Sequence, residues 1–228
     1  MSIEWRQSVL ALQSMQRAPA RYLPLVGVLI GVVGGAVYWL AAQLWPSSVA
    51  VVLSLFAISL LSGNMNEYSV AKLSLLWTDL FVLLVKYNVL MALTAANLGF
   101  PVPANVALGF IMVCGQAASR ALLVSVLSSR VSTNETRASA NDDGRSTPQL
   151  PPRVSSQDVG VSLVLGFAPA ALLGIPGLMG VAAAIVMRLG LAAYLKRDSA
   201  PSRTLLNTIQ QLTEACFYLG ALATWKYI

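Results

Sequence analysis

The chain has 228 residues, of which 57% are hydrophobic and only 11% are charged. Because a typical soluble domain carries about 25% charged residues, this composition excludes an ordinary water-soluble fold. There is no histidine, so the commonest general base and metal ligand are excluded as well. The net charge of +6 is confined largely to alternate polar segments, which is typical of membrane topology, and we expect no nucleic-acid partner.

Residues 1–21 precede the first long apolar segment and mix charged with apolar side chains. They contain no continuous apolar run and no evident cleavage site, so we expect no cleavable signal peptide here. The segment is predicted to form a cytoplasmic amphipathic leader, which lies either on the membrane surface or in solvent.

Apolar segments recur along the rest of the chain, close to or beyond the roughly 18–20 residues that cross a bilayer core. Short polar stretches, prolines and glycines separate them. We therefore predict an all-α, polytopic transmembrane helical bundle with about seven spans. The predicted spans cover residues 22–45, 47–63, 73–96, 104–127, 159–175, 178–195 and 205–225, with a hinge at Pro176-Gly177 between the fifth and sixth.

Composition changes sharply at residues 128–158, which are rich in Ser, Pro, Asp and Arg. This segment is predicted to be a flexible cytoplasmic loop. The chain then divides into the leader, a four-span membrane segment, the loop and a three-span membrane segment. Their bounds are 1–21, 22–127, 128–158 and 159–228.

The basic residues indicate the orientation of the spans. They occur before the first span, between the second and third, in the long loop and before the last span, whereas the segments around Pro46, Pro101 and Pro176 carry no charge. The positive-inside rule therefore places the N-terminus and the charged loops in the cytoplasm, with the chain in the cytoplasmic (inner) membrane.

Glycines recur every four residues in the first span, at Gly27, Gly31 and Gly35, with Gly34 beside them. This spacing leaves one helix face without side chains and predicts close packing against another helix. A nucleotide-binding loop is not expected, because no strand precedes these glycines.

Several polar residues fall inside the predicted spans, where a charge is costly and needs a partner or a function. Asp79 and Lys86 lie two turns apart on one face of the third span, and Glu214 follows Gln210 by one turn in the last. Lys86, Glu214 and Arg120, in the fourth span, either tie helices together or line one polar cavity that faces the cytoplasm. Proton or ion transport would use similar residues.

Six blocks, in this order along the chain, resemble the cobalamin synthase family, adenosylcobinamide-GDP ribazoletransferase. The first reads RYLPLVGVLIG, similar to that family's FPLIGLLLG, and the last, IQQLTEACFYLG, is the most specific. The blocks cover residues 21–31, 60–63, 83–86, 117–121, 142–148 and 209–220.

The resemblance implies a transfer reaction in which ribazole, or its 5′-phosphate, attacks adenosylcobinamide-GDP and GMP leaves. It implies corrinoid and ribazole as substrates, the lipid bilayer as surroundings and other cobalamin-pathway enzymes as possible partners. Mg²⁺ held by carboxylates would neutralise the diphosphate. By the same resemblance Lys86, Arg120, Glu214 and Gln210 are expected to bind the anionic substrate.

The chain departs from the family where the family carries its acidic residues. After the second span the family has a segment such as HLDGLADTCDG, whereas this chain reads MNEYSVAK at residues 65–72. Glu67 is the carboxylate left there as the expected metal ligand, and the family's histidine before its SR pair corresponds to Gln116. Since one carboxylate is few for a magnesium–diphosphate site, we predict weak or no transferase activity.

Three other functions stay open. A catalytically inactive relative would bind corrinoid or a partner enzyme as a membrane scaffold. A small transporter unrelated to cobalamin would contain a water-filled pathway through both leaflets. A different membrane phosphotransferase would use nucleotide-activated alcohols, but it too would need an acidic motif.

Overall fold

The computed structural model describes residues 20–62, 73–95, 104–138, 155–195 and 203–225. Within these ranges every secondary-structure element is a helix, which confirms the all-α fold class. A short 3-10 helix, η2 (Ala20–Tyr22), leads into seven α-helices. These are α2 (Leu23–Leu44), α3 (Ser47–Leu61), α4 (Leu73–Ala95), α5 (Ala104–Ala138), α6 (Ser156–Leu172), α7 (Ile175–Leu195) and α8 (Arg203–Trp225).

Local sequence signals account for several of the helix ends. Pro24 stands in the first turn of α2, where its missing N–H needs no partner. Trp45 is extended, as a residue before proline prefers, and Pro46 caps the start of α3. At the start of α6, Ser155 and Asp158 form a capping box.

Two predicted boundaries are wrong. The turn between α6 and α7 lies at Gly174, whose φ of +66° favours glycine, and not at Pro176-Gly177, which stand in the first turn of α7. Helix α5 continues past Leu127 to Ala138, so the first part of the predicted flexible loop is helical. The sequence becomes more polar at residue 128, but no proline or glycine stops the helix there.

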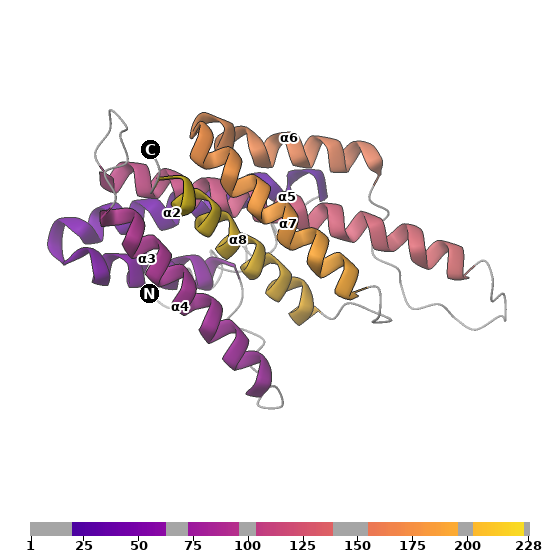
Figure 1. Ribbon diagram of the computed structural model, residues 1–228, viewed down its shortest axis with the longest axis horizontal. Helices are drawn as coiled ribbons and strands as arrows, with labels where there is room; N and C mark the ends of the chain where they lie inside the picture. Colours follow the sequence, from indigo (N-terminus) through magenta and orange to yellow (C-terminus); the bar gives the residue numbers. More distant parts are fainter. Residues whose placement is uncertain (1–19, 63–72, 96–103, 139–154, 196–202, 226–228) are drawn as a thin grey trace, which may run out of the picture.

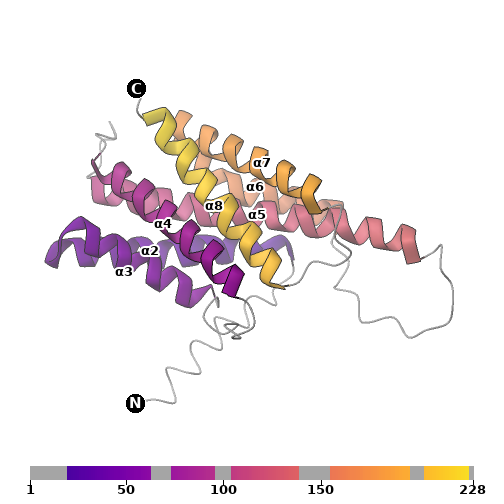
Figure 2. The ribbon, with the colours of Figure 1, turned by 60° about the horizontal axis from the view of Figure 1, so that its bottom comes forward.

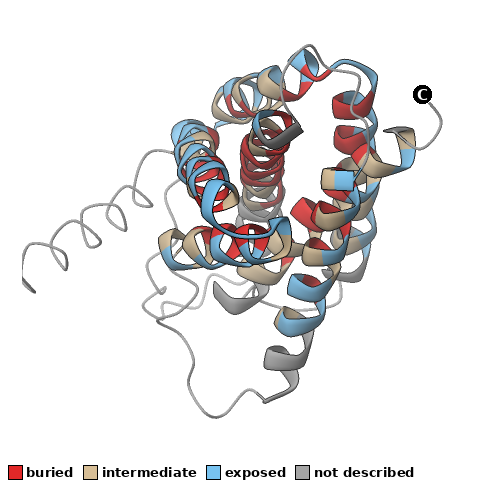
Figure 3. Cartoon of the chain, turned by 90° about the vertical axis from the view of Figure 1, so that its left-hand side faces the viewer, coloured by how far each residue is buried: buried red, intermediate tan, exposed pale blue. Residues whose placement is uncertain are grey.

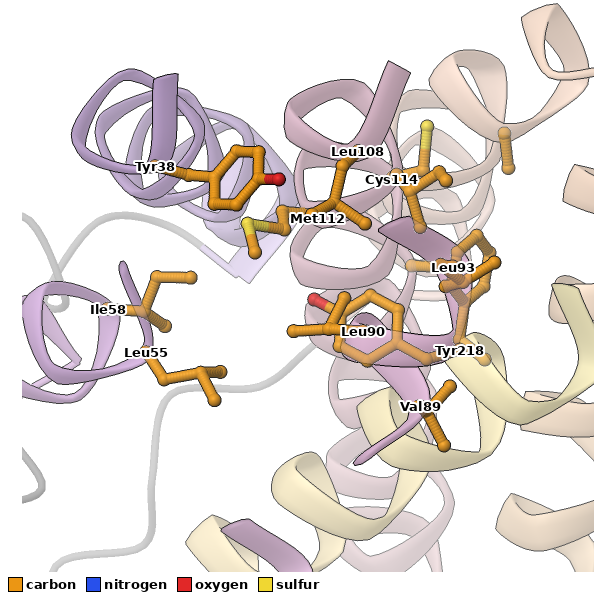
Figure 4. Close-up of a cluster of buried hydrophobic side chains, with 14 of the residues drawn as sticks. Tyr38, Leu55, Ile58, Val89, Leu90, Leu93, Leu108, Met112, Cys114 and Tyr218 are labelled. Atoms are coloured by element: carbon orange, nitrogen blue, oxygen red, sulfur yellow. The ribbon is translucent and has the colours of Figure 1, made fainter. Parts of the chain in front are cut away.

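Helix α5 lies at the centre of the bundle and packs against α2, α4, α6, α7 and α8. Figures 1 and 2 show it running along the length of the molecule with the other helices around it. In Figure 3 buried residues face this centre and exposed residues face outward. Residues Leu108, Ile111 and Met112 of α5 are fully buried and belong to the main apolar core. Figure 4 shows Leu108 and Met112 in this core.

The glycine face of α2 packs on α5, as the spacing of the glycines predicts. A Cβ atom on Gly27 would lie 2.5 Å from the carbonyl oxygen of Gln116, and one on Gly31 would lie 2.5 Å from Val113 Cα. Gly35 faces Gly109. The two helices therefore run antiparallel, with their backbones in close contact. This contact fixes the position of α5 residues 116–120, which belong to the site described below.

Among the described residues, two helical segments, Ala20–Leu44 and Val106–Ser128, are long and apolar enough to cross a membrane, and three shorter apolar helices accompany them. Large apolar side chains also cover much of the outer surface. Exposed examples are Leu40 and Leu44 of α2, Phe81 and Leu84 of α4, and Leu172 of α6. An apolar exterior of this extent is typical of a surface that contacts lipid or another apolar partner.

Candidate functional site

A buried polar cluster lies between α4, α5 and α8. Lys86 of α4 lies near its centre. The Lys86 side chain is only 2% exposed. An ammonium group at such a depth needs a charged or strongly polar partner, because transfer of an unpaired charge out of water is very costly.

Helix α8 supplies these partners. The Nζ atom of Lys86 lies 2.6 Å from Oε2 of Glu214, whose side chain is fully buried. Lys86 also donates a hydrogen bond to Oε1 of Gln211, and the hydroxyl of Tyr218 donates to Oε1 of Glu214 at 2.9 Å. Residues 211, 214 and 218 follow one another at helical spacing, so one face of α8 carries the whole set.

Both carboxylate oxygens of Glu214 are therefore engaged by donors within the protein. The ion pair neutralises Lys86, and Tyr218 satisfies the second oxygen. Asp79, two turns before Lys86 on α4, is partly buried and also interacts electrostatically with Lys86. The Lys86–Glu214 pair is thus internally neutral, and Asp79 adds a further carboxyl group near it.

Arg120 of α5 forms the other half of the cluster and is only 3% exposed. Its Nη2 atom donates to the hydroxyl of Ser62, at the end of α3, over 3.2 Å. Its charge also interacts with Glu214, but within the described ranges no carboxylate lies within 4 Å of it. The Nε atom of Arg120 is buried and has no hydrogen-bond partner among the described residues.

Gln116 stands one turn before Arg120 on α5 and is fully buried. Neither its amide oxygen nor its amide nitrogen has a hydrogen-bond partner among the residues that the structure describes. Gly27 of α2 packs directly over this turn, against the Gln116 carbonyl and the Arg120 side chain. The contact between α2 and α5 therefore lies directly beside the buried side chains of Gln116 and Arg120.

The structure brings together Lys86, Arg120 and Glu214 from helices α4, α5 and α8. Gln210 is buried as well, but Gln211 is the glutamine that binds Lys86. Glu67 lies outside the described residues. Sequence reasoning missed Gln211 and Tyr218 as partners, although their spacing of three and four residues from Glu214 was available as a signal.

The described residues do not fit a magnesium site. Among them no group of three or more Cys, Asp or Glu side chains could hold a metal ion. Glu214, the carboxylate at the centre of the cluster, already accepts from Lys86 and Tyr218. Cys114 is a buried free thiol, and Cys216 is a partly buried one. We therefore derive no step through a metal ion.

A model of the family described as cobalamin-5-phosphate synthase matches residues 4–68 of this chain. The chain is also similar to proteins named adenosylcobinamide-GDP ribazoletransferase. The relative from Leptothrix cholodnii is 52% identical over 54 residues, which are 24% of this chain and 20% of that protein. The relative from Shewanella amazonensis is 41% identical over 59 residues, 26% of this chain and 22% of that protein.

A longer match is to the protein of the same name from Ralstonia nicotianae, 32% identical over 133 residues, which are 47% of this chain and 49% of that protein. The matched stretches thus span at most about half the length of these relatives. No solved structure matches the chain. The resemblance to the cobalamin synthase family is confirmed, although the match to the family model ends before Lys86, Arg120 and Glu214.

Proposed function

We propose that the chain is a membrane transferase of cobalamin biosynthesis, which joins ribazole, or its 5′-phosphate, to adenosylcobinamide-GDP with release of GMP. Similarity to proteins named for this reaction supports the proposal. The structural observation that carries it is the meeting of Lys86, Arg120 and Glu214, residues of three separate resembling blocks, in one buried cluster.

In this reaction a ribazole hydroxyl oxygen forms a bond to the cobinamide-side phosphorus. The bond from that phosphorus to the bridging oxygen breaks, GMP leaves with that oxygen, and the hydroxyl proton is released. Negative charge spreads over the phosphoryl oxygens and the leaving group, so the protein's contribution is cationic positioning. Lys86 is neutralised by Glu214, which leaves Arg120 as the cation of the cluster that lacks a close counter-ion in the described ranges.

The Lys86–Glu214 pair, in this proposal, positions the site. It ties α4 to α8, and Tyr218 holds the second oxygen of Glu214. Gln210, also on α8, is proposed to line the site where the substrate binds. Mg²⁺ at Glu67 is a further proposal inherited from the resemblance, and no described residue supports it.

The surroundings are proposed to be the inner membrane, crossed by about seven helices with the N-terminus and residues 128–158 in the cytoplasm. The apolar outer surface of α2, α4 and α6 supports contact with lipid. Corrinoid and ribazole would then enter from the cytoplasmic side, where partner enzymes of the same pathway could deliver them.

Complementation tests this function in cells. A strain that lacks cobalamin synthase is fed cobinamide and the lower-ligand base, and this chain is expressed in it. The expected result is cobalamin-dependent growth, slower than with an intact synthase because the acidic segment is missing. Absence of growth, with the protein detected in the membrane fraction, would contradict the proposal and favour a non-catalytic binding role.

A further inference from the structure

Arg120 carries a buried charge with no carboxylate within ion-pair distance among the described residues. Its side chain is 3% exposed, and an arginine stays protonated in proteins. The nearest charge interaction is with Glu214, whose oxygens bind Lys86 and Tyr218. A buried charge without a direct partner is costly, so an anion that binds beside Arg120 from outside would be favoured.

Gln116 adds two buried polar atoms without hydrogen-bond partners among the described residues, one turn from Arg120. It precedes Arg120 by four residues on α5, so the two side chains lie on the same face of the helix. Its amide is fully buried, and both polar atoms lack partners within the described part of the chain. Buried polar atoms are almost always hydrogen-bonded in native proteins, so such a group calls for a ligand.

We propose that Arg120 and Gln116 form a binding site for a phosphate oxyanion. The unpartnered Nε–H of Arg120 and the amide N–H of Gln116 would donate to its oxygens, beside the Nη2 atom that already binds Ser62. A guanidinium with an adjacent amide donor suits phosphoryl oxygens in both charge and direction. The amide oxygen of Gln116 would accept from a hydroxyl of the ligand, as a phosphorylated sugar provides.

The inference rests on the proposed function only for the natural ligand, which would be the diphosphate of adenosylcobinamide-GDP. Phosphate oxyanions could also come from lipid headgroups. Binding of either can be measured without any transfer reaction, so the failure of one proposal is separable from the failure of the other.

The test uses the purified full-length chain in a phosphate-free maltoside detergent. One titration adds inorganic pyrophosphate and another adds phosphatidylglycerol, and each follows the thermal unfolding midpoint against matched chloride. We expect a saturable rise of about 5 °C or more at a hundredfold excess over Kd. A response to pyrophosphate indicates a soluble ligand, a response to phosphatidylglycerol alone indicates a lipid headgroup, and a response to neither overturns the site.

Variants locate the response. Arg120→Met and Gln116→Leu should lose it, whereas Arg21→Met, which removes an equal charge from an exposed arginine that stacks on the Tyr22 ring, should keep it. Gln116→Glu supplies a built-in counter-ion, so it should raise the midpoint without anion and abolish the anion response. A lower midpoint with the response retained in Gln116→Glu, or an equal loss in Arg21→Met, would overturn the proposal.

Discussion

A Cβ atom placed on Gly31 would lie 2.5 Å from the Cα atom of Val113, so α2 and α5 approach each other closely through glycine. The same face of α2 covers the turn of α5 that carries Gln116 and Arg120. The packing of these two helices and the geometry of the polar cluster are therefore coupled.

Gly31→Ala is expected to destabilise the protein by about 1–3 kcal/mol, because the added methyl group meets backbone that must shift. The measurement is the thermal midpoint of the purified protein in detergent. Gly190→Ala, on α7, is the matched control, since a Cβ there meets nothing within 4 Å. Its midpoint should be unchanged or slightly raised. Equal midpoints for the two variants would contradict the close contact.

Lys86 and Glu214 are expected to be strongly coupled in a double-mutant cycle. Lys86→Met or Glu214→Gln alone leaves one buried charge unpaired and should cost about 3–5 kcal/mol. The double variant removes both charges and should be more stable than the sum of the single effects predicts. Additive effects, measured as free energies of unfolding, would show that the pair does not interact in the folded protein.

Tyr218→Phe should destabilise by about 1–2 kcal/mol, because it leaves one oxygen of the buried Glu214 carboxylate without a donor. The ring itself, which packs edge-on against Phe217, is kept. Tyr22→Phe makes the same chemical change at an exposed position and should have no effect on the unfolding midpoint. Equal unfolding midpoints for the two variants would show that the Tyr218 hydroxyl does not donate a hydrogen bond to Glu214.

The orientation of the chain can be tested by cysteine labelling. In a background with Cys114→Ala and Cys216→Ala, Ile175→Cys places a thiol at an exposed position beside the α6–α7 turn. A membrane-impermeant maleimide should label it in intact spheroplasts, whereas Arg145→Cys should react only after permeabilisation. The opposite pattern would place the N-terminus outside.

The sequence predicted those features that depend on spacing along one helix. The four-residue repeat of Gly27, Gly31 and Gly35 defines a smooth face, and the structure confirms its close contact. The partner of that face could not be predicted, because the residues it meets lie far along the chain in α5. For the same reason Lys86 and Glu214 were recognised as costly buried charges, but not as a direct pair.

Gln211 shows why the partner of Lys86 could not be predicted from the sequence alone. Gln210 and Gln211 stand four and three residues before Glu214, so both lie near its face of the helix. Which of them reaches Lys86 depends on where α4 crosses α8, and that follows from packing of the whole bundle. The long extension of α5 was missed because polar composition indicates exposure and does not by itself end a helix.

The most direct test of the account is GMP release by the purified protein in lipid nanodiscs, with adenosylcobinamide-GDP and ribazole 5′-phosphate supplied together. We predict slow release that requires both substrates, falls at least tenfold in Arg120→Met and stays near the parent rate in Asn88→Ala, an exposed residue bonded to its own helix. Absence of GMP release from the folded protein, or release that Arg120→Met leaves unchanged, would contradict a transferase site at this cluster.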